Sequence, residues 1–432
     1  MCGIFGFLSI KHNIKIKDLI FRLKKLEYRG YDSSGICFSE NTNYKISKCK
    51  GRIQNLENTL TESLDIETNL AILHTRWATH GEPNTINSHP HHSNDNNIIL
   101  VHNGILENYD SLKKILINNN YVMYSETDTE VLVNFIQYID SLNKENTFLE
   151  NLKVSLKMLE GTFGLLLINK KIPNTIFAIS RSSPVVIGID KNQYYFSSDY
   201  YSFIDKTNNI ITLNDNEIAI VSDKINIETI DNLKINPIIE KIDVNIQDID
   251  KSYFKHFMLK EIFNQSESLL DSMRGRLKLE KKTILGGLNK LFKDTGKTCL
   301  DIISNSKKII LCGCGTSLHS AMIGKYILEE LTNISVEFEQ ASEFRYRHFV
   351  KQDNSCYFFI SQSGETADTI EALKLVKKHN IPCFGICNVI GSFLSRITDG
   401  GIYLHVGPEI GVASTKAFTG QLMIFYILSI II

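Results

Sequence analysis

A cysteine, Cys2, directly follows the initiator methionine. A residue this small normally permits removal of Met1, which would leave a thiol and a free α-amine on one residue. The thiol reacts as its thiolate and has an ordinary pKa of about 8.5, while an α-amino group titrates at about 7.7 to 8.0. The amine can therefore take the thiol proton near neutral pH, directly or through one water, and Cys2 is a candidate nucleophile. By position alone, Cys2 fits better as a small core residue at the start of an apolar strand.

Three other segments of the first half carry residue types that suit a site for a polar substrate. Arg76, one of ten arginines, and Trp77, the only tryptophan, come just after an apolar run. Asn103 and Gly104 follow another apolar run, and Asp128 lies where a helical pattern opens. Taken singly, each has a structural explanation: Arg76 fits a surface ion pair, Asp128 a helix cap and the Asn103 segment an ordinary turn.

Five blocks of the sequence resemble, in order, the class II glutamine amidotransferases, and within that class the glutamine–fructose-6-phosphate aminotransferase family. The blocks are Cys2–Gly6, Tyr28–Gly35, His74–Gly81, His102–Gly104 and Ser125–Glu130. Five ordered blocks are far more specific than any single one. The resemblance implies an α/β fold of the N-terminal nucleophile (Ntn) hydrolase type, an αββα sandwich of two sheets between two helical layers.

The same resemblance implies a catalytic role for three residues. Cys2 would attack the side-chain amide of glutamine to give a thioester and ammonia. Asn103 and the backbone N–H of Gly104 would form the oxyanion hole. Donors aimed at a developing oxyanion suit this step, and the loss of one typically costs roughly 2.7 to 4 kcal/mol of transition-state stabilisation.

Five residues are expected to bind the glutamine itself. Arg76 can fork onto the α-carboxylate, and Asp128 can pair with the α-ammonium group. The resemblance implies that Thr79 and His80 complete the carboxylate end, and that Trp77 gates the route of ammonia to a second domain. Together with the nucleophile and the oxyanion hole, these residues offer a partner for each charged and polar group of glutamine. This match favours a glutamine site over the separate structural explanations of the single residues.

Hydroxyl-rich turns recur in the second half of the chain. Two follow the expected strands 308–313 and 356–360, and a third spans 411–416. Such turns bring backbone N–H groups and hydroxyls to helix N-termini, where a phosphate is favoured electrostatically. One turn would be only an N-cap, but three at one sheet indicate a shared ligand crevice.

A dinucleotide site fits these turns less well. Gly313-Cys314-Gly315 lacks a third glycine at position 318, where Leu318 stands, so the Rossmann fingerprint is not met. The stretch instead resembles the sugar isomerase (SIS) domain, a flavodoxin-like parallel sheet that binds phosphosugars. By this resemblance, six residues hold the sugar phosphate and two lie beside the sugar: Thr316, Ser317, Ser361, Gln362, Ser363 and Thr366, then Val412 and Ser414.

The elements around these segments predict two domains. Short apolar runs mixed with helical patterns predict a mixed α/β glutaminase domain over 2–222. A polar, charge-alternating stretch predicts a linker over 223–250, followed by connecting helices over 251–305. Regular alternation of strands and helices over 306–432 predicts a parallel sheet covered on both faces, the first SIS domain.

Full members of the resembled family carry a second SIS domain and a C-terminal tail, and no second copy of the pattern follows Ile432. We therefore expect a truncated chain. The main hypothesis is an aminotransferase that makes glucosamine 6-phosphate and glutamate from fructose 6-phosphate and glutamine, a step of amino-sugar synthesis. The alternative is a fragment with glutaminase or phosphosugar-binding activity only. A purine-type amidotransferase is disfavoured because it would show a phosphoribosyl-pyrophosphate loop.

The balance of charged residues limits the classes of partner that the chain is expected to bind. Lys and Arg number 47 against 48 Asp and Glu, so the net charge of −1 indicates neither a nucleic-acid partner nor an anionic membrane surface. The apolar run 422–432 is too short to span a membrane and predicts self-association. The resemblance implies a homodimer in full-length relatives, which leaves a complementing C-terminal fragment as a further expected partner.

The cysteines and histidines indicate which cellular compartment suits the chain and whether it binds a metal. Nine irregularly spaced cysteines suit reduced thiols in the cytoplasm. A metal site could be sought among His80, His89, His91 and His92, or at the pairs Cys312 with Cys314 and Cys383 with Cys387. The histidines lie in a polar loop with no matching carboxylate pattern, and the cysteines fall in or beside apolar strands. We expect no metal and no cofactor.

Overall fold

The structure, a computed structural model, describes residues 2–432 except for 42, 79–80, 243–253 and 278–282. The chain divides into two compact units, Met1–Ile246 and Gln247–Ile432. Each unit has its own sheets and its own hydrophobic core.

Unit 1 contains two large antiparallel sheets and a two-stranded one formed by β2 (Ile14–Lys15) and β5 (Glu67–Thr68). The first has eight strands in the order β17-β13-β11-β12-β1-β6-β3-β4. Their bounds are β1 Gly3–Ser9, β3 Ser33–Glu40, β4 Asn43–Lys50, β6 Leu70–Arg76, β11 Val186–Asp190, β12 Gln193–Ser197, β13 Asn209–Thr212 and β17 Glu240–Lys241. The second has seven strands in the order β16-β15-β14-β10-β9-β8-β7. Their bounds are β7 His91–His92, β8 Ile98–Leu106, β9 Gly161–Asn169, β10 Ile176–Arg181, β14 Glu217–Val221, β15 Ile225–Thr229 and β16 Lys234–Ile235.

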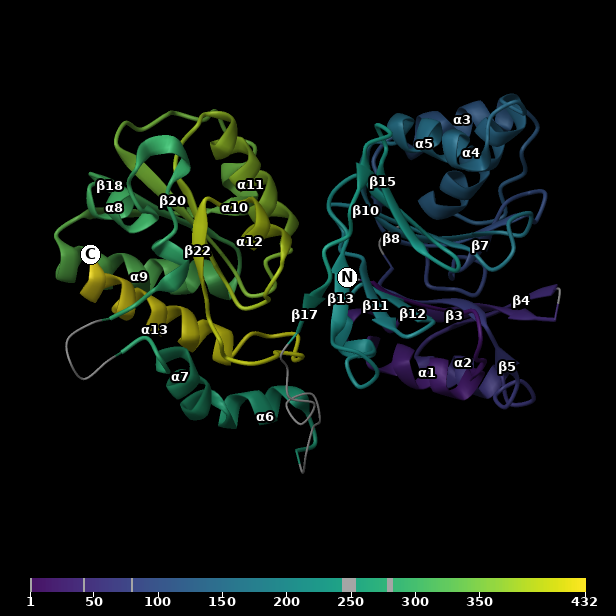
Figure 1. Cartoon of the computed structure of the whole chain (residues 1–432), viewed down its shortest axis with the longest axis horizontal. Coiled ribbons are helices and arrows are strands. Elements are labelled where there is room, and N and C mark those ends of the chain that lie inside the picture. The colour runs from purple at the N-terminus through teal and green to yellow at the C-terminus, as the bar shows by residue number, and fades with distance from the viewer. Residues whose placement is uncertain (1, 42, 79–80, 243–253, 278–282) are drawn as a thin grey trace. The chain divides into compact units, whose positions relative to one another are not determined.

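The two sheets lie face to face between helical layers (Figure 1). Apolar residues from both sheets, such as Ile4, Ile72, Val101 and Leu166, form one core between them. Helices α1 (Ile16–Lys24) and α2 (Ile53–Thr59) contact the first sheet. Helices α3 (Tyr109–Asn118), α4 (Asp128–Leu142) and α5 (Phe148–Met158) pack on the second. The predicted αββα sandwich is confirmed.

The stretch predicted as a linker is partly strand. β15 and β16 extend the second sheet, and β17 pairs with β13 in the first. In β15 the apolar residues Ile225 and Ile227 alternate with the polar residues Asn226 and Glu228, and Ile227 is buried. This two-residue period is the strand signal, and it outweighs the charge alternation from which the linker was inferred.

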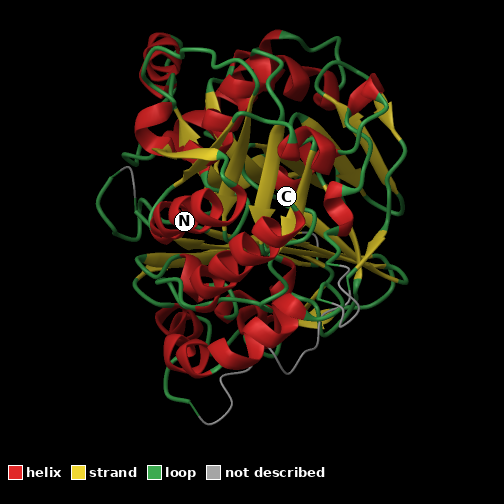
Figure 2. Ribbon diagram, turned by 90° about the vertical axis from the view of Figure 1, so that its left-hand side faces the viewer, coloured by secondary structure: helices red, strands yellow, loops and turns green. Residues whose placement is uncertain are grey.

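Unit 2 contains a five-stranded parallel sheet in the order β19-β18-β20-β21-β22. The strands are β18 Lys308–Gly313, β19 Ser335–Gln340, β20 Ser355–Ser361, β21 Cys383–Cys387 and β22 Gly400–Tyr403. One face is covered by α8 (Cys299–Ser304), α9 (Thr316–Thr332) and α13 (Lys416–Ile431). The other face is covered by α10 (Ala341–Phe344), α11 (Ala367–Lys378) and α12 (Phe393–Ile397). Figure 2 shows helices on both sides of the strands of this unit. The predicted parallel sheet with helices on both faces is confirmed.

Two helical details of unit 2 differ from or refine expectation. The connecting helices expected over 251–305 include α6 (Phe257–Phe263) and α7 (Gln265–Met273), which meet at Asn264. In α13 the residues Ile424 and Phe425 are buried within the unit, whereas Tyr426 and Ile430 are exposed. Among the described residues, no helix combines the length and apolarity that crossing a membrane requires.

Candidate functional site

Cys2 lies immediately before β1, next to the segment that follows β6. The backbone N–H of Trp77 donates to the Cys2 Sγ at 3.2 Å, and the Sγ lies 3.5 Å from the Trp77 carbonyl oxygen. Burial raises the pKa of the Cys2 thiol, and the hydrogen bond from Trp77 and the charges of Arg76 and Arg29 oppose this rise. Met1 is outside the described residues, so its removal stays a prediction.

Asn103 and Gly104 lie at the end of β8, beside Cys2. The Asn103 Nδ2 donates to the backbone carbonyl oxygen of Cys2 at 2.9 Å. Gly104 has a φ of +142°, and a Cβ at this position would lie 2.0 Å from the carbonyl oxygen of Thr162 on β9. Only glycine fits here, so the path of β8 after Asn103 depends on this residue type.

Arg76 and Asp128 are both buried, one at the end of β6 and the other at the start of α4. The Asp128 Oδ2 accepts the backbone N–H of Leu106 at 2.9 Å. Burial lowers the pKa of Arg76, and the nearby charges of Cys2 and Asp128 partly offset this effect. Arg76 thus interacts electrostatically with both the candidate nucleophile and Asp128, and a cation and an anion so placed suit a zwitterionic substrate.

The start of α4 holds Asp128 in place by ordinary capping. The Thr127 Oγ1 accepts the backbone N–H of Glu130 at 3.2 Å, and the Glu130 carboxylate accepts the N–H groups of Tyr124 and Ser125 at 2.9 and 2.6 Å. An acidic residue in the first turn is also favoured by the helix dipole. The segment Ser125–Glu130 is therefore a folded N-terminus of a helix as well as a candidate binding segment.

Of the three other predicted glutamine-binding residues, the structure describes Trp77 but not Thr79 and His80. Trp77 is 39% exposed, and its ring meets Tyr31 edge to face at 5.5 Å. The backbone N–H of Ala78 donates to the Asp32 Oδ2 at 2.8 Å, which ties two of the five sequence blocks together. Thr79 and His80 lie outside the described residues.

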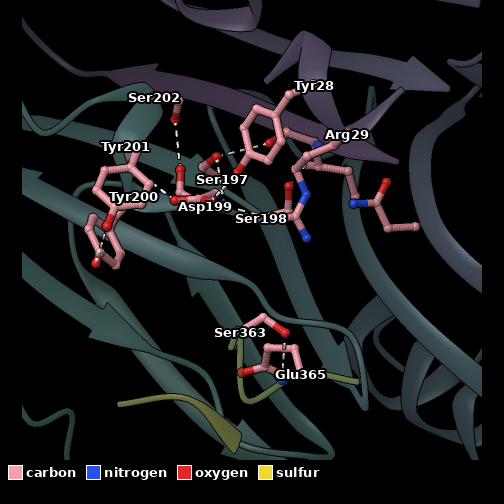
Figure 3. Close-up of polar contacts among 12 residues, drawn as sticks. Tyr28, Arg29, Ser197, Ser198, Asp199, Tyr200, Tyr201, Ser202, Ser363 and Glu365 are labelled. Atoms are coloured by element: carbon pink, nitrogen blue, oxygen red, sulfur yellow. Dashed lines mark hydrogen bonds and ion pairs between the residues drawn. The ribbon is translucent and has the colours of Figure 1, made fainter. Parts of the chain in front are cut away.

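Sequence reasoning missed a polar cluster behind Cys2. The Arg29 Nε donates to the Cys2 carbonyl oxygen at 3.2 Å, and its Nη1 lies 3.4 Å from the Asp199 Oδ2. The Tyr28 hydroxyl donates to the same carboxylate, which also accepts the N–H of Tyr201 at 3.0 Å (Figure 3). Burial, together with Asp199, raises the pKa of Tyr28, so this hydroxyl stays protonated and donates. Tyr28 and Arg29 belong to one of the five blocks, but Asp199 carries no local signal.

Buried histidines form a second unpredicted cluster in unit 1. The rings of His74 and His89 stack at 4.1 Å, and His91 meets His89 edge to face at 5.1 Å. All three are buried, although His89 and His91 were expected in a polar loop. Burial lowers the pKa of His74 to about 3 and the pKa values of His89 and His91 well below their ordinary value, so the rings are neutral.

In unit 2 the first two hydroxyl-rich turns lie side by side. Gly313 and Ile360 are paired in the parallel strands β18 and β20, so the loops after these strands start together. In the second loop the Ser361 Oγ lies 2.9 Å from the Thr366 Oγ1 and accepts the N–H of Gly364 at 3.0 Å. Among the remaining predicted residues of these loops, Thr316 begins α9, the Ser363 Oγ accepts the N–H of Glu365 at 3.1 Å, and the Gln362 carbonyl accepts the N–H of Asn388 at 3.0 Å.

Two further hydroxyls of the predicted sugar-phosphate site, those of Ser317 and Ser414, are also hydrogen-bonded within the protein. Ser317 is buried, and its Oγ accepts from the Gln421 Nε2 of α13 at 3.0 Å. The Ser414 Oγ donates to Glu409 at 2.8 Å. The same carboxylate accepts the N–H of Thr415 at 2.7 Å and so caps the start of α13, while Val412 is largely exposed.

Comparisons with known proteins support two functional domains. A family model for a glutamine amidotransferase domain matches residues 74–205, and one for the SIS domain matches residues 302–431. The chain is 41% identical to the glutamine–fructose-6-phosphate aminotransferase [isomerizing] of Bacteroides thetaiotaomicron, over 100% of this chain and 69% of that protein. The enzyme of the same name from Chlorobaculum tepidum is 41% identical, over 99% of this chain and 69% of its own length. A solved C-terminal domain of glucosamine-fructose-6-phosphate aminotransferase from Francisella tularensis is 39% identical, with a TM-score of 0.37, over 42% of this chain and 48% of that one.

Proposed function

Since the chain belongs to the glutamine–fructose-6-phosphate aminotransferase family, we infer that it transfers the amide nitrogen of glutamine to fructose 6-phosphate, giving glucosamine 6-phosphate and glutamate. The observation that carries this conclusion is the match at 41% identity over the whole chain. The match includes both an amidotransferase and an SIS domain, which fits the coupled reaction and not an uncoupled fragment.

The proposed first step is attack by the Cys2 thiolate on the amide carbon of glutamine. After Met1 is removed, the α-amine of Cys2 takes the thiol proton and returns it to the leaving nitrogen. The new C–S bond forms, the C–N bond breaks, and ammonia departs; water then hydrolyses the thioester to glutamate. Asn103 and the N–H of Gly104 would stabilise the oxyanion, and the contact between Asn103 and Cys2 at 2.9 Å supports this role.

Binding of glutamine is proposed to use the opposite charges of Arg76 and Asp128. Arg76 takes the α-carboxylate, with Thr79 and His80, and Asp128 takes the α-ammonium group. Both charged side chains are buried, so water screens them weakly and the pairing gains strength. Trp77 is proposed to control where the released ammonia goes.

The sugar phosphate is proposed to bind at the loops after β18 and β20. Hydroxyls and backbone N–H groups at the starts of α9 and α11 supply neutral donors for an anion. The proposed phosphate ligands are Thr316, Ser317, Ser361, Gln362, Ser363 and Thr366, with Val412 and Ser414 beside the sugar. Ser317 and Ser414 would have to exchange their present partners for the ligand.

The proposal includes a cytoplasmic location and a dimeric assembly. All nine cysteines are free, as suits a reducing cytoplasm. We propose a homodimer, with a complementing C-terminal fragment as a further partner where the reaction requires one. Sedimentation of the purified chain tests the dimer.

The function is tested by supplying glutamine and fructose 6-phosphate to the purified chain and measuring glucosamine 6-phosphate, glutamate and free ammonia. We expect aminosugar and glutamate in equal amounts. Glutamate and ammonia without aminosugar would reject the coupled reaction for this polypeptide and leave glutamine hydrolysis alone.

For the sugar site, we expect Thr366→Val to raise the KM for fructose 6-phosphate about tenfold, because it removes a hydroxyl that would contact a charged group. Thr369→Val is the matched control, since the buried Thr369 hydroxyl on α11 has no hydrogen-bond partner in the described part of the chain. Steady-state kinetics of aminosugar formation measure both variants. Equal effects of the two substitutions would remove Thr366 from the proposed site.

A further inference from the structure

The core between the two sheets of unit 1 becomes polar at one end. Side chains two residues apart share a face of a strand. On β6, Ile72 faces the core between the sheets, so His74 and Arg76 continue the same face. On β8, Val101 faces that core, so Asn103 continues its face. His74 and Asn103 therefore lie next to each other, although their strands belong to opposite sheets.

The two side chains are hydrogen-bonded there. The His74 Nε2 lies 3.1 Å from the Asn103 Oδ1 and 3.0 Å from the carbonyl oxygen of His102. Both of these oxygens are acceptors, so the Nε2 must carry the ring proton and donate to both. This fixes the tautomer, with a bare Nδ1, and it fixes which end of the Asn103 amide faces His74.

The other half of the His74 ring has no polar partner. Its Nδ1 is buried and makes no hydrogen bond to any residue that the structure describes. Burial, with the charge of Arg76 as a second cause, lowers the pKa of His74 to about 3, so the ring does not gain a second proton at working pH. A buried nitrogen without a partner costs free energy. The interactions that offset this cost are the two hydrogen bonds of the Nε2, one of which goes to Asn103.

A second ring helps to hold the backbone next to Asn103. His89 stacks on His74, and its Nδ1 accepts the N–H of His102 at 3.4 Å. The N–H and the carbonyl of His102 are thus bound by two stacked imidazoles. The His102 side chain points the other way, where its Nδ1 lies 3.0 Å from the Thr129 Oγ1. The residue before Asn103 is fixed on every side.

We propose that His74 is a positioning residue for glutamine hydrolysis, because its Nε2–H binds the Asn103 Oδ1 and so keeps the Nδ2 turned toward Cys2. This inference rests on the proposed role of Asn103 as a donor to the oxyanion. With a reversed amide, an oxygen would face the developing negative charge and would oppose the reaction. His74 touches neither the substrate nor the nucleophile in this scheme and acts only through Asn103.

The test uses two amides of different reach at position 74. In His74→Gln, the side-chain N–H₂ reaches the place of the imidazole Nε2 and can still donate to Asn103. In His74→Asn, the amide is one bond too short. We expect His74→Asn to lower kcat for glutamine hydrolysis roughly ten- to a hundredfold, with the KM for glutamine changed less than about twofold. His74→Gln is expected to keep most of the wild-type kcat.

A double-mutant cycle with Asn103→Ala identifies the route of the effect. Because Asn103→Ala leaves no amide to orient, adding His74→Asn to it should lower kcat no further. His91→Asn is the control for loss of a buried imidazole, since the His91 Nε2 lies 3.0 Å from the Thr127 Oγ1 instead. It should lower the melting temperature without lowering kcat.

The outcomes separate the inference from the function on which it rests. Full activity of Asn103→Ala would overturn the proposed oxyanion role itself. An impaired Asn103→Ala combined with an unimpaired His74→Asn would overturn the role of His74 alone. The role of His74 would also be overturned by a loss of kcat that persists in the Asn103→Ala background, or by an equal loss in His91→Asn.

Discussion

Replacing Cys2 by alanine is expected to abolish glutamine-dependent formation of glutamate and aminosugar, with a fall in kcat of about four orders of magnitude or more. The substitution removes the atom that forms the thioester, and what remains is the modest rate that a binding site and an oxyanion hole can sustain. The KM of any residual reaction should stay near that of the wild type, since Arg76 and Asp128 are untouched. Glutamate release, measured with excess enzyme, gives the loss.

Controls separate the nucleophile from a general effect of losing a thiol. Cys49→Ala removes another thiol of unit 1, 9% exposed on β4, and should leave kcat within a factor of about two. Binding of fructose 6-phosphate to Cys2→Ala, followed by thermal shift, should match the wild type. Glutamine hydrolysis by Cys2→Ala at even a hundredth of the normal rate would contradict the assignment.

The α-amine of Cys2 can be tested without touching the thiol. Inserting one lysine between Met1 and Cys2 should prevent removal of the methionine and displace the amine. Mass spectrometry of the active wild-type protein is expected to show the chain beginning at Cys2. An active preparation that retains Met1 would leave the thiol without its proposed base.

Much of the catalytic arrangement could be predicted because it is local in sequence. Asn103 and Gly104 follow the apolar run of one strand, Arg76 ends another, and Asp128 opens a helix, so each could be recognised from a short segment. What the segments could not provide is the distance between them. The Asn103 to Cys2 contact joins residues a hundred positions apart, and it appears only when β8 and β1 belong to facing sheets.

The missed residues share the property that their partners are remote. Asp199 binds Tyr28 and Arg29 from about 170 residues away and follows no motif. The histidines were misjudged for a related reason. Residues around His89 are polar, which is typical of an exposed loop, yet this loop folds into the end of the core between the sheets, where His89 stacks on His74. Local polarity could not reveal that burial.

The second large effect is expected from Gly104→Ala. At a φ of +142° an L-residue is strained, and the added methyl group would lie 2.0 Å from the Thr162 carbonyl oxygen and 2.7 Å from its carbonyl carbon. Both neighbours are backbone atoms of β9, so a side-chain rotation cannot relieve the clash. The β8–β9 pairing must shift, and the Gly104 N–H moves with it. We expect kcat for glutamine hydrolysis to fall about 10²- to 10³-fold, the usual cost of one oxyanion donor.

Gly51→Ala is the matched control for the backbone strain. Gly51 also has a positive φ, +92°, in unit 1, but its nearest neighbour is the amide nitrogen of the Asn55 side chain, which can move away. Both variants should unfold at lower temperature, because alanine disfavours a positive φ. Only Gly104→Ala should lose kcat when both are assayed well below their melting temperatures. If the two variants kept equal kcat, Gly104 would be a structural glycine, and the oxyanion would have to be held by Asn103 and other donors.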